Sequence, residues 1–564
     1  MVERASPDGL ELTVRAVVIG ALLGIVFAVG NVYVGLKTGI SDNATVTAAI
    51  LGFALCGRLG KRPYSALENN ITQNVSSSAA TMPSAMGFLG SFPALTLMGA
   101  EYPEWAVLLW GGAIGLFGIA LAFPLRKRFV NDGELPFPDA IATAEVINAM
   151  HTSGIRALGK AQALVTAAVG SGFFAWFRDG SPKLVPEMSY VPFALGGIAA
   201  APLSLGVIWS PLLVSVGMLI GPRTGLGLFV GATLGWVVVA PWLVTEQIVA
   251  EATNAALKGW LVWPGAALMI AGALTALARD WRLVARSARD VRALGTDGWR
   301  SLVAPVVLAL AVTAIGWVSF GIGPLIVLGA VGISAVTAIV VARSIGETAW
   351  MPLGSIGRLA QLMLAPWTHQ SFSSVISASI PSGSGSQTGQ TLETLKVGRL
   401  LGASPHNQIK AQLVGALVGA PFAAGAYVML THAYQLGGTE LPAPTASPWK
   451  VMAELVSEGA AAIPPLAGTA SLVAFGVGVA LTLLDRTRVA RFVPSGFAIG
   501  LALILGAAPA FTMAAGALLY LVLARWRPGW TAEYGQSVAA GGVVGEALAG
   551  ILVATLLVTH VLGN

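Results

Sequence analysis

Long apolar stretches, each nearly free of charge, recur along the whole 564-residue chain and constrain its fold more than any other feature. A straight transmembrane helix needs about twenty apolar residues. The clearest stretches are Val14–Val34, Ala44–Cys56, Trp105–Phe123, Ala161–Phe177, Thr224–Val244, Trp260–Ala278, Leu302–Val318, Pro324–Val341, Gln408–Leu430, Ala467–Leu484, Pro494–Leu505, Phe511–Leu523 and Val538–Val561. They predict an all-α polytopic membrane protein with about 12–16 transmembrane helices, some of them broken or re-entrant because several stretches are short.

The composition agrees with a membrane protein. Only 10% of the residues are charged and 55% are hydrophobic, whereas about 25% of the residues of a soluble domain are charged. The net charge of +6 does not indicate a nucleic-acid partner, because Lys and Arg gather in the cytoplasmic loops of membrane proteins. The single cysteine, Cys56, excludes an internal disulfide.

A basic segment and a weak internal repeat suggest how the chain is organised. Residues 279–300 are rich in arginine and lie near the middle of the chain, so we interpret them as cytoplasmic. We expect an N-terminal membrane half at 1–280, a cytoplasmic linker at 281–300 and a C-terminal membrane half at 301–564. The offset that aligns Thr143 with Thr391 also pairs Glu145 with Glu393. This favours two related halves, and their relative orientation, parallel or inverted, stays open.

The segment before Glu145 should interrupt a helix. Pro136 and Pro138 each lack a backbone N–H and bias the preceding residue toward extended geometry, so a short new helix should begin there. Glu145 lies two turns into that helix. A partly desolvated carboxylate has a raised pKa and can relay protons. The alternative for Glu145 is a structural cap or ion pair.

The matching segment in the second half is the Gly/Ser run Ile380–Gln390, which is followed by Glu393 and Lys396. Irregular backbone inside a membrane protein usually lines a solute path. Exposed amides in this run would suit a carboxylate, and Gln387 would face the same path. A flexible connector is the alternative.

Polar side chains are also dense from Glu68 to Asn74, where Asn70 and Gln73 are the strongest candidates for lining a cavity. The segment runs on into small and apolar residues. This favours a re-entrant or broken helix, and a cytoplasmic loop is the alternative.

Two charges lie near opposite ends of the chain, within or beside apolar stretches. Lys37 follows Asn31 and Tyr33 at the end of the first stretch, and Glu546 lies inside the last one. A charge at the centre of a span costs about 2.5–3.5 kcal/mol on insertion scales. Lys37 therefore either snorkels to the interface or serves a polar path or an acidic partner. Glu546 is either a site residue or a buried, partnered acid at a helix contact.

Enzyme chemistry is not indicated. The sequence has no His/Cys cluster with metal-ligand spacing and no credible Ser/His/Asp arrangement. We expect no enzyme, no resident metal and no cofactor.

Four motifs resemble the oligopeptide transporter family, which includes the yellow-stripe-like metal–chelate transporters. They are Asn31-x-Tyr33-x-Gly35-Leu36-Lys37-Thr38-Gly39, Leu135-Pro136-Phe137-Pro138 with Ala142-Thr143-Ala144-Glu145, Lys396-x-Gly398 with Leu401-Gly402-Ala403-Ser404-Pro405, and Gly545-Glu546. The chain lacks the Asn-Pro-Gly and Lys-Ile-Pro-Pro-Arg motifs of the eukaryotic peptide branch, so it is more similar to a prokaryotic member near the yellow-stripe-like branch.

The resemblance implies a proton-coupled symporter that imports small oligopeptides or peptide-like metal chelates across a bacterial cytoplasmic membrane. Its partners would be that substrate, protons and membrane lipid, without nucleic acid, and a homodimer stays open. The residues expected along the substrate and cation pathway are Asn31, Tyr33, Lys37, Glu68, Asn70, Gln73, Glu145, Gln387, Glu393, Lys396 and Glu546. A passive channel and a sodium-coupled transporter are the alternatives.

Overall fold

The computed structural model describes residues 11–559, except 42, 58–61, 132–134, 136, 153, 280–299, 349–350, 352, 369, 439, 485–486 and 488–492. The predicted linker at 281–300 therefore lies, apart from its last residue, outside the described residues. The described chain is almost entirely helical, which confirms the predicted fold class. Ten of its helices are long and apolar enough to cross a membrane.

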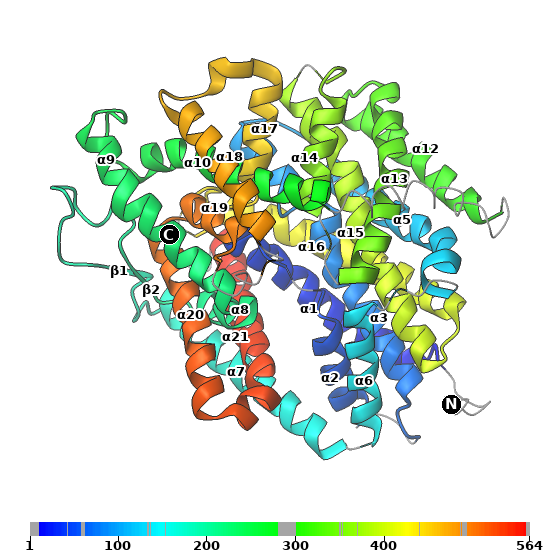
Figure 1. Ribbon diagram of the computed structural model, residues 1–564. Helices are drawn as coiled ribbons and strands as arrows, with labels where there is room; N and C mark the ends of the chain where they lie inside the picture. The colour runs from blue at the N-terminus through cyan, green and yellow to red at the C-terminus, as the bar shows by residue number, and fades with distance from the viewer. Residues whose placement is uncertain are drawn as a thin grey trace. The chain divides into compact units, whose positions relative to one another are not determined.

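The chain forms two compact units, and both predicted halves contribute to each (Figure 1). The first unit holds the described residues of Met1–Gly35, Ile40–Gln162 and Asp280–Met429, and the second holds those of Leu36–Gly39, Ala163–Arg279 and Leu430–Asn564.

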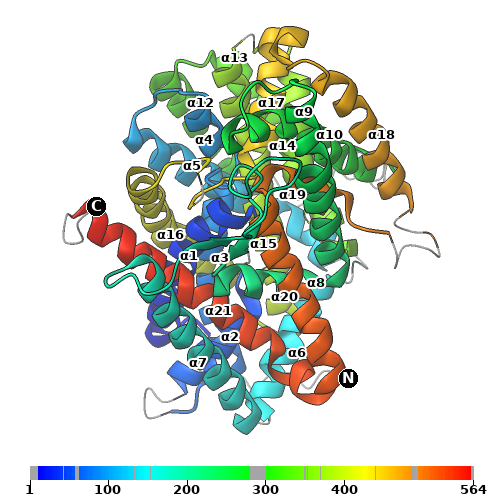
Figure 2. The same cartoon turned by 90° about the vertical axis from the view of Figure 1, so that its left-hand side faces the viewer.

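The first unit contains most of α1 (Val14–Thr38), α2 (Thr45–Cys56), α3 (Ala66–Ala85), α4 (Ser91–Leu97), α5 (Glu104–Arg126), the π-helix η1 (Lys127–Asn131), α6 (Pro138–Thr152), α12 (Arg300–Phe320), α13 (Pro324–Thr348), α14 (Leu353–Leu364), α15 (Ser371–Leu401) and α16 (Pro405–Ala433). Helix α3 is buried along nearly its whole length. It packs beside α15 (Figures 1 and 2).

Glycine residues on the neighbouring helices allow α3 to pack closely against them. A Cβ added at Gly383 of α15 would overlap the carbonyl oxygen of Ala85, and one added at Gly415 of α16 would overlap that of Val75. Close backbone approach through glycine is typical of helix contacts in membranes. The glycines that we read from sequence as irregular backbone thus serve helix packing.

The structure corrects the predicted backbone of the two polar segments. Both α3 and α15 are continuous helices and are not broken within these segments, and neither alternative, a loop or a connector, is present. Hydroxyl groups in α15 donate to carbonyls one turn earlier: Ser384 Oγ to Ile380 O at 2.7 Å, and Thr388 Oγ1 to Ser384 O at 2.8 Å. This intrahelical bonding lets Ser and Thr sit inside a buried helix.

The break before Glu145 is confirmed. Helix α6 begins at Pro138, at the position where proline is tolerated. The preceding Phe137 has a positive φ of 50°. Its N–H donates to Gly346 O at 2.8 Å, which fixes the turn.

The second unit contains most of α7 (Gly154–Asp179), the strands β1 (Met188–Tyr190) and β2 (Gly206–Ile208), α8 (Pro211–Ala232), the π-helix η2 (Thr233–Val239), α9 (Ala240–Thr245), α10 (Asn254–Arg279), α17 (Ala446–Glu458), the 3₁₀-helix η4 (Gly459–Ala462), α18 (Ala467–Leu484), α19 (Gly496–Leu505), α20 (Ala507–Trp526) and α21 (Pro528–Val558). The strands are antiparallel, with Ser189 opposite Val207. Helix α8 packs along α20, and α10 packs against α18 and α19 (Figure 2). Trp236, Trp260 and Trp263 anchor its apolar core.

Candidate functional site

The start of α3 is fixed by Glu68. Ser65 and Glu68 form a capping box at the helix N-terminus. The Glu68 carboxylate also accepts from Arg15 at 2.6 Å and from Thr13 Oγ1 at 2.7 Å. These partners hold Glu68 as a charged anchor between α1 and α3.

Beyond Glu68, the buried part of α3 and the facing part of α15 carry six side-chain amides, which we call the amide cluster. It consists of Asn69, Asn70, Gln73, Asn74, Gln387 and Gln390. Gln73 and Gln390 both donate to Ser77 Oγ, at 3.1 and 3.0 Å. Gln387 donates to Ser78 Oγ at 2.9 Å. The hydroxyl groups of Ser77 and Ser78 on α3 thus join the two helices. The second polar atom of each amide is not used in these hydrogen bonds.

That second polar atom has no hydrogen-bond partner among the described residues. This holds for Oδ1 of Asn69, Asn70 and Asn74, for Nδ2 of Asn70, and for Oε1 of Gln73, Gln387 and Gln390. A buried polar atom left without a partner costs about 1–3 kcal/mol. Because the orphan atoms are concentrated on one pair of helices, this region offers hydrogen bonds to water or to a polar ligand.

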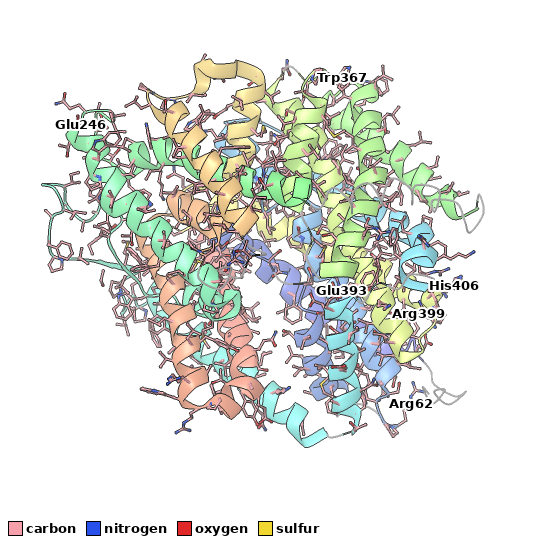
Figure 3. All side chains as sticks on the ribbon, viewed as in Figure 1. Arg62, Glu246, Trp367, Glu393, Arg399 and His406 are labelled. Carbon is pink, nitrogen blue, oxygen red and sulfur yellow. The ribbon has the colours of Figure 1, made fainter. Side chains whose placement is uncertain are left out.

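Glu393 and Lys396 follow the amide cluster along α15. Glu393 is 3% exposed, and it lies between Trp367 near the top of the view and Arg62 near the bottom (Figure 3). Lys396 Nζ donates to Leu135 O at 3.0 Å. This bond ties α15 to the break before α6.

Glu145 does not share the setting of Glu393, although the repeat pairs them. Its side chain is exposed on α6. The partial desolvation that we inferred for Glu145 is therefore wrong, because α6 turns this position away from the helices it packs against. Thr143, two residues earlier on α6, is buried.

Two further predicted pathway residues lie on α1 in the first unit. Asn31 Nδ2 donates to Ala80 O on α3 at 2.8 Å. Tyr33 is buried on the same helix. Asn31 therefore binds the backbone of the helix that carries four of the six amides of the amide cluster.

The second unit contains a fully enclosed group of charges, which we call the charged centre: Lys37, Arg178 and Glu546. Glu546 is 0% exposed. Its Oε1 lies 3.0 Å from Arg178 and 3.4 Å from Lys37 Nζ. Lys37 thus pairs with an acid and does not snorkel.

The same carboxylate caps α8. Ser210 Oγ donates to Glu546 Oε1 at 2.8 Å, and the N–H of Leu212 donates to Oε2, also at 2.8 Å. A carboxylate at a helix N-terminus is favoured by the free N–H groups and the helix dipole. Both Glu546 oxygens are therefore fully used in joining the end of α1, α7, α8 and α21.

Sequence reasoning missed the two arginines Arg15 and Arg178 and three members of the amide cluster, Asn69, Asn74 and Gln390. Arg15 and Arg178 lie at the ends of apolar stretches, where an arginine is expected to mark the membrane interface. The local sequence does not indicate that either arginine has a distant acidic partner. Gln390 was visible in the Gly/Ser run but was read as part of an irregular backbone.

An all-α, polytopic chain with a buried polar helix pair has the features of a membrane transport protein, because polar side chains inside membrane proteins usually mark a substrate or ion path. Within that class, the chain belongs to the OPT oligopeptide transporter family, whose sequence model matches residues 11–557.

Individual relatives agree with this assignment. The chain is 24% identical to a Saccharomyces cerevisiae protein named as a candidate oligopeptide transporter, over 93% of this chain and 91% of the relative. It is 24% identical to a rice protein named as a probable metal-nicotianamine transporter, over 97% and 86%. It is 25% identical to a Haemophilus influenzae protein named as a candidate oligopeptide transporter, over 94% and 93%.

Proposed function

We propose that this protein is a proton-coupled symporter that imports small peptides or peptide-like metal chelates across a bacterial cytoplasmic membrane. The observation that carries the proposal is the amide cluster, whose orphan polar atoms lie on two buried, facing helices. Peptides and amino-acid-derived chelates present amide, amine and carboxylate groups, which complement such atoms.

A metal would be carried as part of the substrate. Within the described part of the chain, no group of three His, Cys, Asp or Glu side chains could hold a metal ion. In the proposal, the amide cluster therefore contacts the organic part of a chelate, so the same site serves a peptide and a chelate.

We assign the coupled proton to Glu393. It is buried one helical turn beyond Gln390, so protonation would alter the charge next to the proposed substrate site. Glu68 and Glu546 hold helices together through their ion pairs, and a proton on either carboxylate would weaken those contacts. Glu145 is exposed, so its charge lies away from the buried helices.

Uptake into proteoliposomes under an imposed pH gradient tests the proposal. Labelled di- and tripeptides and iron or zinc chelates are offered with and without the gradient, and sodium replaces potassium in a parallel series. We expect accumulation above the external concentration only with an inward proton gradient. Equilibration without accumulation would identify a passive channel, and dependence on sodium alone would identify a different coupling ion.

Glu393→Gln and Glu145→Gln form a matched pair for the coupling residue. We expect Glu393→Gln to remove gradient-driven accumulation while exchange of substrate across the membrane persists, because the binding helices stay intact. Glu145→Gln should retain accumulation. Loss of accumulation in Glu145→Gln with retention in Glu393→Gln would refute the assignment.

A further inference from the structure

Arg358 on α14 is a buried cation that the transport proposal does not use. Its side chain is 5% exposed. Its Nε is enclosed and has no partner, and no described residue gives its guanidinium a hydrogen bond or an ion pair. Arg178, by contrast, has an acidic partner, because it lies 3.0 Å from Glu546.

The charge on Arg358 persists despite burial. Burial lowers the pKa of Arg358 to about 10, and no acidic group among the described residues opposes that shift. The guanidinium is therefore protonated at neutral pH. An uncompensated buried charge is strongly unfavourable, so a negatively charged group from outside the described chain is expected to accompany it.

The guanidinium lies against the first turn of α14. A Cβ added at Gly354, the second residue of this 12-residue helix, would lie 3.0 Å from one terminal nitrogen of Arg358 and 3.4 Å from the other. Gly354 itself is exposed. The guanidinium therefore lies next to an exposed position that carries no side chain.

The same turn supplies further donors. The first N–H groups of an α-helix have no acceptor within the helix, and the helix dipole makes this end positive. Helix N-termini bind anions for that reason. An arginine that reaches back to the N-terminus of its own helix adds two N–H groups in a planar fork, which matches the oxygens of a carboxylate or phosphate.

We propose that Arg358 and the first turn of α14 form a binding site for a single oxyanion, a carboxylate or a phosphate. The group comes either from a small soluble anion, which includes the carboxylate of an amino-acid-derived solute, or from the headgroup of an anionic lipid. The proposal concerns binding alone and stands whether or not transport is coupled to protons.

Thermal unfolding of the purified full-length protein tests the site, because a ligand that binds only the folded state raises the apparent Tm by mass action. In uncharged maltoside detergent the protein is titrated with sodium phosphate and with sodium acetate, while sodium chloride holds the ionic strength constant. In a second arm it is placed in phosphatidylcholine nanodiscs with or without phosphatidylglycerol. We expect a saturable rise in Tm with at least one probe.

Three variants locate the effect. Arg358→Met should weaken the anion response at least tenfold and should melt at or above the wild type when no binding anion is present, because it removes an uncompensated charge. Gly354→Ala places a methyl group against the guanidinium and should weaken the response while the charge remains. Arg525→Met, on an exposed position of α20, should respond like the wild type.

The responses of the apparent Tm distinguish the two sources of the oxyanion and test the site itself. A response to phosphate or acetate in detergent identifies a soluble oxyanion, and a response confined to phosphatidylglycerol identifies a headgroup. No saturable response of the wild type to any probe would overturn the site, as would wild-type affinity in Arg358→Met. If Arg358→Met does not fold, Gly354→Ala decides in its place: wild-type affinity there overturns the proposal.

Discussion

The amide cluster of the first unit and the charged centre of the second unit bury polar groups in opposite ways. In the charged centre, both oxygens of Glu546 are occupied by Lys37, Arg178, Ser210 and the Leu212 N–H. In the amide cluster, every amide keeps at least one atom without a partner. Charged groups whose hydrogen bonds and ion pairs are all formed hold helices together. Neutral groups with an unpaired polar atom can still form a hydrogen bond to a ligand. The following predictions test this contrast.

The largest effect on stability is expected at Glu546. Glu546→Gln removes the anion shared by two cations, and breaking a buried ion pair costs ~3–5 kcal/mol. The variant should show a markedly lower apparent Tm in detergent, followed by intrinsic tryptophan fluorescence. Glu454→Gln is the control: its pair with Lys450 is in contact with solvent, the side chains being 24% and 36% exposed, and solvent-accessible pairs contribute only ~0–1 kcal/mol. Equal shifts of the apparent Tm in the two variants would contradict a structural role for the charged centre.

An intermediate effect is expected where α15 touches α3. Gly383→Ala should destabilise the first unit by ~1–3 kcal/mol, since overpacking forces helices apart and the new methyl group would overlap the Ala85 carbonyl oxygen. Gly425→Ala on α16 is the matched control, because a Cβ there meets nothing within 4 Å. Melting of both variants, compared with the wild type, checks the prediction. A tolerated Gly383→Ala would mean that the helices are less closely packed than described.

The smallest effect on stability is expected at Gln387. Gln387→Ala loses one hydrogen bond, worth ~0.5–1.5 kcal/mol, but also removes an orphan oxygen that costs ~1–3 kcal/mol, so the free energy of unfolding should barely change. Substrate uptake should nevertheless fall about tenfold, which corresponds to ~1.4 kcal/mol of lost binding. Uptake and apparent Tm are measured on the same preparations.

Gln412→Ala provides the opposite case within the same unit. Gln412 is paired at both ends: its Nε2 donates to Thr394 Oγ1 at 2.7 Å, and its Oε1 accepts from Thr391 at 3.4 Å. Its loss should lower the Tm more than Gln387→Ala does and should reduce uptake less. The reverse order would place the binding groups in the paired network and not in the amide cluster.

The sequence identified several parts of the candidate site but not their geometry. The sequence indicated Glu68, Asn70, Gln73 and Gln387, because polar residues are unusually dense around them in an otherwise apolar chain. The breaks predicted in their backbone are absent, because α3 and α15 are continuous helices. A Gly/Ser run has the same composition in a loop as in a helix whose hydroxyls bond to its own carbonyls. The structure shows that this run is helical, and that Gly383 within it lies close to the Ala85 backbone.

The repeat is the clearest limit of sequence reasoning here. It pairs Glu145 with Glu393, yet one carboxylate is exposed on the short α6 and the other is buried on the long α15. An offset between two sequence positions carries no information about which face of a helix meets a neighbour.

By itself, the sequence determined that this chain is a polytopic helical membrane protein, because the length and apolarity of its stretches depend only on local composition. It also determined the start of α6, because proline acts on its own backbone. The tertiary structure alone decided the partners of the buried charges: Lys37 with Glu546, Arg15 with Glu68, and Arg358 with no described partner. Partners so distant in sequence meet only through helix packing, which no local pattern encodes.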